Sequence, residues 1–395
     1  MCPFRPFDTS VPRGRPGRLP RVGPLLLAAV LALPRPLAAQ SAPAVAEAPA
    51  PTRYADAIEQ ARRTVAEVMA RNGIPGLSVA VLVDGEIVWS EGFGYADVEH
   101  RVPVTPLTRF RIGSISKPVT AFAIARLHDE GRLDLDAPVQ RYVPSFPEKR
   151  WPITTRQLAG HTAGIRHYRG NEMLSARRYA TVVEGLEIFA ADSLLFEPGT
   201  AYHYSSYGWN LISAVIEGAS GEEFLAYMRR EVFEPLGLRS IVAEHTDSII
   251  AYRARFYERD RETGRLLNAE YVDNSYKWAG GGFISNTEDL VRFGWVHLEG
   301  GVLRPETIRM LFTSQRTRSG EETGYGIGWR VDTDAAGRHR YHHTGGSVGG
   351  RAVMVLYPAE RVVVAALANL GSAPMSPQLA ERLAEPFFAE VTASR

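Results

Sequence analysis

The chain has 395 residues, of which 45% are hydrophobic and 23% charged, and its formal net charge is +1. These values are ordinary for a soluble globular protein with one large domain or two smaller ones. The first 39 residues hold six arginines and one aspartate, so the remainder carries 39 basic and 43 acidic side chains. This balance leaves no basic surface of the kind that binds nucleic acid, and we expect no nucleic-acid partner.

Residues 1–39 have the features of an export signal. Five arginines precede the apolar run VGPLLLAAVLALP, which is too short to span a bilayer and ends near small residues. We expect cleavage after Ala39 and a periplasmic or secreted mature protein without a membrane span. An organellar transit peptide or a wrongly assigned start codon is the alternative, because the arginine-rich part is long and prolines interrupt the apolar run. The only cysteine, Cys2, lies in this segment.

Residues 40–53 are rich in alanine and proline and predict a disordered linker. The folded domain is expected over residues 54–395. Its first 20 residues, 54–73, have apolar positions at helical spacing and end at Asn72-Gly73, as a helix with a glycine end does. The stretch LSVAVLVDGEIVWSEGFGYAD then predicts two strands joined by a tight turn at Asp84-Gly85.

The middle of the chain, from Pro118 to Phe312, is mostly helical and loop-rich in its pattern. Four strand-like runs and a closing helix at 376–391 follow it. The four runs are residues 324–333, 338–346, 350–358 and 361–370. Because strands on both sides enclose a helical insert, the pattern predicts an α/β protein. We expect one antiparallel sheet flanked by N- and C-terminal helices, with a separate helical lobe.

The stretch FRIGSISKPVT contains the first candidate catalytic pair, Ser114 and Lys117. The chain has only three lysines, Lys117, Lys149 and Lys277, and otherwise uses arginine. A lysine can lose its proton once it is desolvated, which an arginine cannot, so Lys117 is a candidate base. Ser114 and Lys117 lie three residues apart at the start of a predicted helix and therefore share one face. The spacing S-x-x-K is known in serine hydrolases, and a capping serine with a solvent-facing lysine is the alternative.

Two further motifs extend this pattern. EPGTAYHYSSYGWNLISAVIE places Tyr204 just before an amphipathic helix, and YHHTGGSVGG places His343 on a strand followed by glycines. In this order the motifs resemble those of the class C β-lactamase and penicillin-binding-protein family, the S12-type serine hydrolases. SEGFGYADVEHRVPVTP, LDLDAPVQRYVPSFPEK, HTAGIRHY and DNSYKWAGGGFIS are similar, more closely, to the serine β-lactamase-like proteins of mitochondria and their bacterial relatives.

The resemblance covers residues 74–370 and implies a β-lactamase/transpeptidase-like fold. It implies that Ser114 is the acylated nucleophile, that Lys117 belongs to the proton network, and that Tyr204 is the general base or shares that role with the lysine. The backbone N–H groups of Ser114 and Gly346 would form the oxyanion hole. The positions implied for substrate binding are Ser206, His343, Thr344 and Gly345.

The sequence departs from the family pattern at two positions. Ser206 stands where Y-x-N has its asparagine, and His343 stands where K-T-G has its lysine. A shorter hydroxyl and a group charged only below neutral pH should hold a β-lactam less firmly, which points away from efficient lactamase action. His342 and His343 face opposite sides of a strand and cannot form a metal pair. We expect no metal and no cofactor.

Four other residues near these motifs are weighed as well. Tyr202 and Tyr207 are the nearby alternatives to Tyr204 as the tyrosine of the site. We expect His161 to be structural, because a histidine in a turn is more often hydrogen-bonded than catalytic. Lys277 lies in a stretch that resembles the family, and the sequence assigns it no role.

The sequence thus predicts an exported serine hydrolase that acts on an amide or ester through a covalent acyl-enzyme on Ser114. A peptide is the first expected substrate and a small ester the next. The alternatives are a weak β-lactamase and a catalytically idle penicillin-recognising or scaffold protein. The presence of Ser114, Lys117 and Tyr204 together argues against the idle protein, because a binding module has no need of all three. The sequence makes no prediction of the oligomeric state.

Overall fold

The computed structural model of the chain describes residues 52–393. The predicted signal peptide, and the predicted linker up to residue 51, lie outside the described residues. The helices are α1 (Ala55–Asn72), α2 (Ser116–Asp129), α3 (Thr155–Ala159), α4 (Ser206–Ser220), α5 (Phe224–Met228), α6 (Thr287–Glu299), α7 (Pro305–Phe312) and α8 (Pro377–Ala393). The strands are β1 (Gly76–Val83), β2 (Glu86–Asp97), β3 (Val102–Pro103), β4 (Phe110–Arg111), β5 (Val242–Ala243), β6 (Tyr257–Arg259), β7 (Leu266–Asn268), β8 (Phe283–Ser285), β9 (Arg330–Thr333), β10 (His339–Ser347), β11 (Gly350–Tyr357) and β12 (Val362–Ala368).

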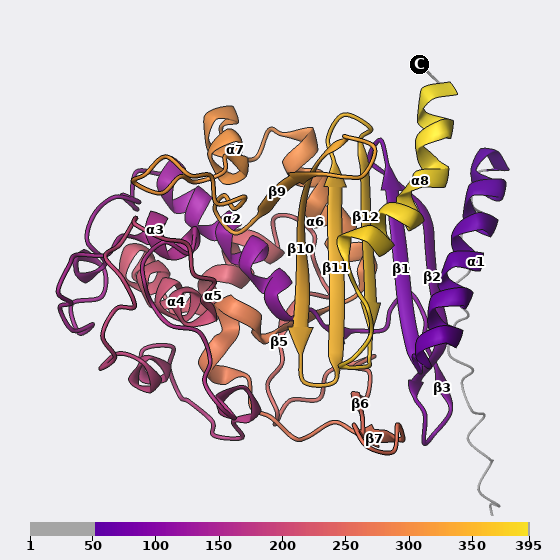
Figure 1. The fold of residues 1–395 in the computed structure, drawn as a ribbon, viewed down its shortest axis with the longest axis horizontal. Helices are drawn as coiled ribbons and strands as arrows, with labels where there is room; N and C mark the ends of the chain where they lie inside the picture. The colour runs from indigo at the N-terminus through magenta and orange to yellow at the C-terminus, as the bar shows by residue number, and fades with distance from the viewer. Residues whose placement is uncertain (1–51, 394–395) are drawn as a thin grey trace, which may run out of the picture. The chain divides into compact units, whose positions relative to one another are not determined.

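A seven-stranded antiparallel sheet joins the two ends of the described chain. Its strand order is β3-β2-β1-β12-β11-β10-β9. The first strand pairs directly with the last one, with Val81 opposite Val364. The predicted single sheet built from N-terminal and C-terminal strands is therefore confirmed, and Figure 1 shows the indigo and yellow strands side by side.

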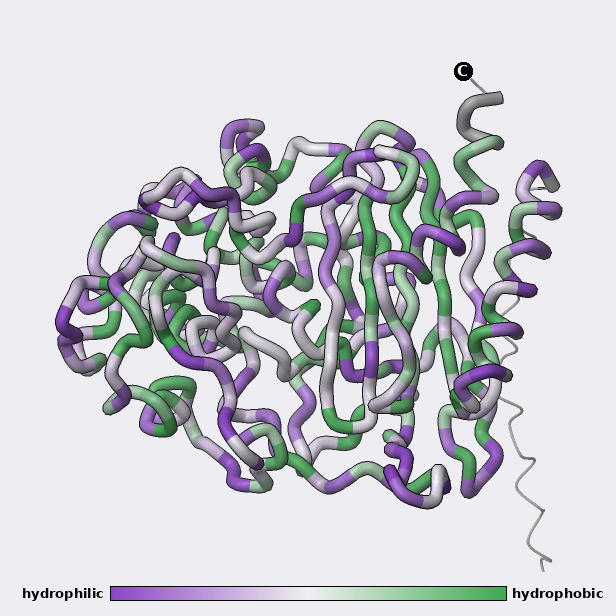
Figure 2. Tube along the Cα trace, in the orientation of Figure 1, coloured by the Kyte–Doolittle hydropathy of each residue, from purple (hydrophilic) through white to green (hydrophobic). Residues whose placement is uncertain are grey.

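Apolar side chains cover both faces of this sheet. Along β1, Val79 and Val81 belong to a core shared with α1 and α8, whereas Ala80 and Leu82 belong to a core shared with α2, α4 and α6. A strand buried on both faces reads as a continuous apolar run, and in Figure 2 the central strands are largely green. The sheet thus separates two hydrophobic cores, and the helical lobe packs against one of them.

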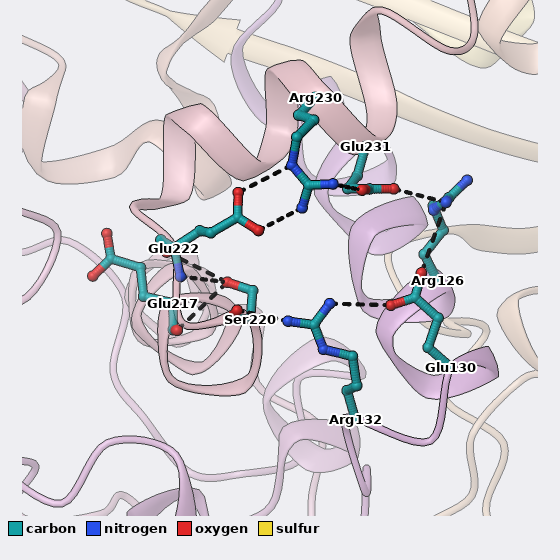
Figure 3. Close-up of polar contacts among 8 residues, drawn as sticks. All are labelled: Arg126, Glu130, Arg132, Glu217, Ser220, Glu222, Arg230 and Glu231. Carbon is teal, nitrogen blue, oxygen red and sulfur yellow. Dashed lines mark hydrogen bonds and ion pairs between the residues drawn. The ribbon is translucent and has the colours of Figure 1, made fainter.

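The helical lobe consists of α2 to α5 with their connecting loops, and it lies on the β10 side of the sheet (Figure 1). A network of charged side chains on its surface links α2 to the segments that flank α5 (Figure 3). Arg126 pairs with Glu231 at 2.7 Å, Arg132 pairs with Glu130 at 3.3 Å, and Arg230 pairs with both Glu222 and Glu231. We name this set the lobe-surface network, and each of its arginines has a carboxylate partner.

The middle of the chain and the run 324–333 differ from their predictions. The middle carries the predicted helices. It also contains the hairpin β6-β7 and contributes β5 and β8 to a small sheet of order β4-β8-β5. The predicted strand 324–333 forms a ladder only over β9. The preceding residues pack on α2 instead: Gly328 has a φ of +79°, and a Cβ there would lie 2.7 Å from the Cβ of Ala121. Glycine permits this close approach, and the turn ends the strand early.

None of the helices within residues 52–393 combines the length and the apolar character that crossing a membrane requires.

Candidate active site

Ser114 lies in a short 3₁₀ turn, Gly113–Ile115, that leads directly into α2. The turn is pressed against the backbone of β10. Gly113 has a φ of +49°, and a Cβ on it would lie 2.7 Å from both the backbone nitrogen and oxygen of Gly346. Only glycine can adopt this positive φ and lie this close to the backbone of Gly346 without strain. The packing places a partly exposed Ser114 beside the β10 segment that carries the H-T-G motif.

Lys117 is buried in the first turn of α2, and its Nζ lies 2.9 Å from Oγ of Ser114. Its other partners are Oγ of Ser206 at 3.1 Å and the carbonyl oxygen of Gly280 at 2.7 Å. Burial holds the pKa of Lys117 well below its usual value, and the charges of Lys277 and Arg330 lower it further. A neutral amine can donate to the Gly280 carbonyl and accept a proton from the serine hydroxyl.

Tyr204 precedes α4 by two residues, and its ring lies beside Lys117. The ring centroid is 4.9 Å from Nζ of Lys117. Burial raises the pKa of Tyr204, and a hydrogen bond with Ser114 opposes the shift. Of the two alternatives, Tyr207 donates to a carboxylate oxygen of Glu172 at 2.8 Å and stacks on a phenylalanine ring, and Tyr202 packs against His161. Among these tyrosines, Tyr204 is the one placed next to the serine and the lysine.

Two histidines hold the backbone on either side of Tyr204. The carbonyl oxygen of His161 accepts from the N–H of His203 at 2.8 Å, and its Nδ1 accepts from the N–H of Ser205 at 3.0 Å. Nδ1 of His167 accepts from the N–H of Ser206 at 3.1 Å. Both rings must be neutral to accept, and burial lowers the pKa of each, to about 4 for His167. His161 thus has the structural role expected of it, and the sequence analysis missed His167.

His343 lies in the site, and its surroundings favour the neutral form of the ring. Its Nδ1 is 2.6 Å from the carbonyl oxygen of Thr344, to which it must donate, and its Nε2 is 2.8 Å from the hydroxyl of Tyr325. Burial and the neighbouring Lys117 hold the pKa of His343 well below its usual value. The expectation that this histidine gains charge just below neutral pH is therefore wrong. Both causes come from the folded structure, which buries the ring, places the hydroxyl of Tyr325 against Nε2 and brings Lys117 close.

The glycines of the H-T-G-G segment allow backbone to approach backbone. A Cβ at Gly345 would overlap the carbonyl oxygen of Ile112. On the other side, β9 pairs with β10 only from His339 to His342. The outer edge of β10 beyond that point therefore faces the turn of Ser114. Thr344 is partly exposed beside it.

Two cations of the site, Arg330 and Lys277, form no ion pair with a carboxylate in the described part of the chain. Arg330, the first residue of β9, has its guanidinium carbon 5.8 Å from the ring centroid of Tyr204 and 5.7 Å from that of Tyr325. Within residues 52–393, neither Arg330 nor Lys277 forms an ion pair with an Asp or Glu. The sequence analysis gave Arg330 no role, because nothing in the local pattern distinguishes it from the many other arginines.

Lys277 lies in a 3₁₀ turn, Ser275–Lys277, that follows the Asp-Asn pair of DNSYKW. The nearest acid that acts on it is Glu244, which is already bound by Arg111 at 2.6 Å and by Asn274 at 2.8 Å. Burial and the charge of Arg111 lower the pKa of Lys277 to about 7. Lys277 is therefore a second buried amine whose charge reaches Lys117.

One group of side chains in the described part of the chain has the spacing of metal ligands. It consists of Asp97, the last residue of β2, with Glu99 and His100 in the turn that follows. This turn lies at the opposite edge of the seven-stranded sheet from β10. Arg255 pairs with both carboxylates, at 3.4 and 3.3 Å, so each carboxylate already has a cationic partner within the protein.

The family model described as Beta-lactamase matches residues 61–385, a range that contains the whole cluster around Ser114. The chain belongs to the beta-lactamase family. Within this family it is 35% identical to the "Serine beta-lactamase-like protein LACTB, mitochondrial" of Homo sapiens, over 78% of this chain and 73% of that protein. It is also 28% identical to "Penicillin-binding protein 4*" of Bacillus subtilis (strain 168), over 72% of this chain and 66% of the relative.

A solved structure supports the same assignment. The octameric penicillin-binding protein homologue from Pyrococcus abyssi is 28% identical and superposes with a TM-score of 0.73, covering 84% of this chain and 77% of its own. These comparisons confirm the predicted fold and family. The chain is a beta-lactamase-related serine hydrolase.

Proposed function

We propose that this beta-lactamase-family enzyme cleaves an ester or amide bond, with a peptide as first expected substrate, through a covalent acyl-enzyme on Ser114. The observation that carries the proposal is the contact between Ser114 and Lys117. Their side-chain atoms lie 2.9 Å apart, and burial lowers the pKa of the lysine so that it can be neutral. A neutral amine at hydrogen-bond distance is the group that a serine needs in order to attack a carbonyl.

In the first half of the reaction, Oγ of Ser114 attacks the substrate carbonyl and its proton passes to Nζ of Lys117. The backbone N–H groups of Ser114 and Gly346 hold the negative oxygen of the tetrahedral intermediate. Tyr204, whose pKa burial raises, keeps its proton and hydrogen-bonds to the serine. We therefore assign the base role to Lys117. When the bond to the leaving group breaks, Tyr204 gives its proton to the leaving group and takes the serine's proton from Nζ of Lys117, so that both side chains end the half-reaction neutral.

In the second half, water attacks the acyl carbon and gives a proton to Lys117. The bond to Oγ of Ser114 then breaks, the proton passes from Lys117 to Oγ, and the acid is released. The expected weakness toward β-lactams now has a different basis. The hydroxyl of Ser206 is already 3.1 Å from Lys117, and both ring nitrogens of His343 have partners within the protein. Neither residue is therefore free to hold the amide or the carboxylate of a lactam.

The test compares p-nitrophenyl butyrate, a short peptide amide and a chromogenic cephalosporin as substrates of the purified protein. We expect hydrolysis of the ester or the peptide, slow or no hydrolysis of the cephalosporin, and loss of all activity in Ser114→Ala. Activity that survives in Ser114→Ala contradicts the assignment of the nucleophile. Cephalosporin turnover as fast as that of the ester contradicts the account of Ser206 and His343.

A further inference from the structure

A pocket of about 630 Å³ lies in the helical lobe between α5 and β5, and none of the residues around Ser114 lines it. Pockets of this size with a largely apolar lining and a few polar groups bind small organic molecules. We name it the α5–β5 pocket. Its apolar lining consists of Leu225, Phe233, Leu238, Ile241, Val242 and Ala243.

The α5–β5 pocket has a buried floor and a partly exposed rim. Phe233, Leu238 and Ile241 are buried and belong to the core that the lobe shares with the sheet, so packing fixes the floor. Leu225 and Val242 are only partly buried and leave apolar surface in contact with solvent. An apolar chain that covers this surface removes it from water, which favours binding.

The charged residues of the lining favour an anion. They are two arginines, Arg229 and Arg239, and one acid, Glu234. Glu234 lies 3.9 Å from Arg229, whereas Arg239 is exposed and forms no ion pair with an Asp or Glu within residues 52–393. A guanidinium presents a planar pair of N–H donors that matches the two oxygens of a carboxylate. The pocket thus places a carboxylate-binding group at the rim of an apolar floor.

We infer that the α5–β5 pocket is a second ligand site, which binds a fatty-acid-type carboxylate with one alkyl chain. The chain lies on the apolar floor and the carboxylate contacts Arg239. The pocket is connected to the catalytic site through His245, whose ring centroid is 4.9 Å from that of Trp278. Trp278 begins the turn whose Gly280 carbonyl accepts from Lys117. Because the pocket itself contains no catalytic residue, its ligand should bind equally well to Ser114→Ala.

The test compares decanoate with decanol, which share an alkyl chain and differ in the charge of the head group. Isothermal titration calorimetry on the purified protein measures both affinities. In the wild type we expect one decanoate per chain, bound about tenfold more tightly than decanol because of one charge-assisted contact. In Arg239→Gln this ratio should fall to about one, with the change in decanoate alone. Leu225→Ala should weaken both ligands by a similar factor, because it removes apolar contact only.

Arg101→Gln is the matched control for loss of an arginine. Arg101 lies just before β3, with its guanidinium carbon 6.0 Å from the ring centroid of Tyr95. It forms no ion pair with an Asp or Glu among the described residues, and it does not line the pocket. Its ratio should equal that of the wild type. Melting curves show whether each variant is folded.

Three results would overturn the inference. The first is a wild-type protein that does not bind decanoate, or a ratio near one. The second is a high ratio that persists in Arg239→Gln, or that is lost in Arg330→Gln instead, because the acid would then lie in the catalytic site. The third is a dimer that binds neither ligand and that Leu225→Asp dissociates, because a second copy would then cover the pocket. Ester hydrolysis by Ser114→Ala bears only on the proposed function.

Discussion

The cations of the lobe-surface network and the cations of the site differ in their partners. Arg126, Arg132 and Arg230 each pair with a glutamate on the lobe surface (Figure 3). Lys277, which is buried, and Arg330, which is half-buried, form no ion pair with an Asp or Glu among residues 52–393. Exposed pairs contribute little to stability, whereas a buried cation without a partner is costly.

This difference indicates what the charges of the site do. If Arg330 and Lys277 only supported the fold, glutamates could pair with them as they do on the surface. Unpaired, they lower the pKa of Lys117. We propose that the cost in stability is kept because it supports a neutral lysine. The predictions below test this contrast from its strongest point to its weakest.

The largest effect is expected at the nucleophile. Ser114→Ala removes the atom that forms the acyl-enzyme, and ester hydrolysis should fall by about 10³-fold or more. The variant should keep the thermal stability of the wild type, because Ser114 is partly exposed and only its hydroxyl is lost. Steady-state kinetics and a melting curve on the same preparation check both statements.

The next largest effect is expected at Lys117. Lys117→Arg keeps a positive charge but cannot accept a proton, so it should lose about 10²- to 10⁴-fold in kcat, nearly as much as Lys117→Ala. Because Lys117 is buried, the larger arginine side chain can disturb folding. Circular dichroism spectra of the variants are therefore measured together with their kinetics. A folded arginine variant with more than roughly a tenth of wild-type kcat would falsify the base role.

A smaller loss is expected when the backbone around Tyr204 is released. His161→Ala removes the acceptor for the N–H of Ser205, 3.0 Å away, and should lower kcat about ten- to hundredfold through misplacement of the tyrosine. His161→Asn places an oxygen where Nδ1 was and should recover part of that loss, whereas His161→Gln, whose oxygen lies farther out, should not. Equal activities of the asparagine and glutamine variants would argue against this positioning role.

A change in pH dependence is expected at Lys277. Lys117 must be neutral to accept a proton, so activity should fall as the pH drops through its lowered pKa. Lys277 has a pKa of about 7 and is charged below that pH, where its charge lowers the pKa of Lys117. Lys277→Gln removes that charge, so the acid limb of the pH–rate profile should move to higher pH.

The difference between Lys277→Gln and the wild type should appear below about pH 7 and shrink above it, because the wild-type amine is then neutral as well. The charged neighbours of Lys277, Arg111 and Glu244, are unchanged in the variant. A profile that shifts to lower pH, or a difference confined to alkaline pH, would contradict the proposed influence of Lys277 on Lys117.

The smallest effect is expected on the lobe surface. Glu222→Gln removes one partner of Arg230, yet Arg230 keeps its pair with Glu231. Exposed ion pairs are screened by solvent and salt. Ester hydrolysis and the free energy of unfolding should therefore equal those of the wild type within experimental error. A marked loss of activity in Glu222→Gln would remove the contrast between surface and site.

Much of the fold and part of the site could be predicted from the sequence, because both depend on local patterns. Strand periodicity at both ends of the chain predicted a single sheet, and the confirmed pairing of β1 with β12 follows from it. The rarity of lysine and the three-residue spacing predicted the contact of Lys117 with Ser114. The family resemblance, which the matching family model confirms, indicated which further motifs to expect at the site.

The remaining features depend on contacts between distant segments. The neutral state of His343 comes from burial and the charge of Lys117. The backbone beside Tyr204 is held by His161, which is 44 residues from its partner Ser205. Arg330 enters the site because the glycine-rich turn before β9 packs on α2, as the +79° φ of Gly328 permits. No periodicity or motif in the sequence carries this information.

The central claim is that Ser114 becomes acylated with the help of a neutral Lys117. Intact-mass spectrometry after incubation with a fluorophosphonate probe, followed by peptide mapping, tests it most directly. We predict one adduct per chain, located on Ser114, that is absent in Ser114→Ala and forms far more slowly in Lys117→Arg. An adduct on another serine, such as Ser206, or ester hydrolysis by a protein that the probe does not label, would contradict the account.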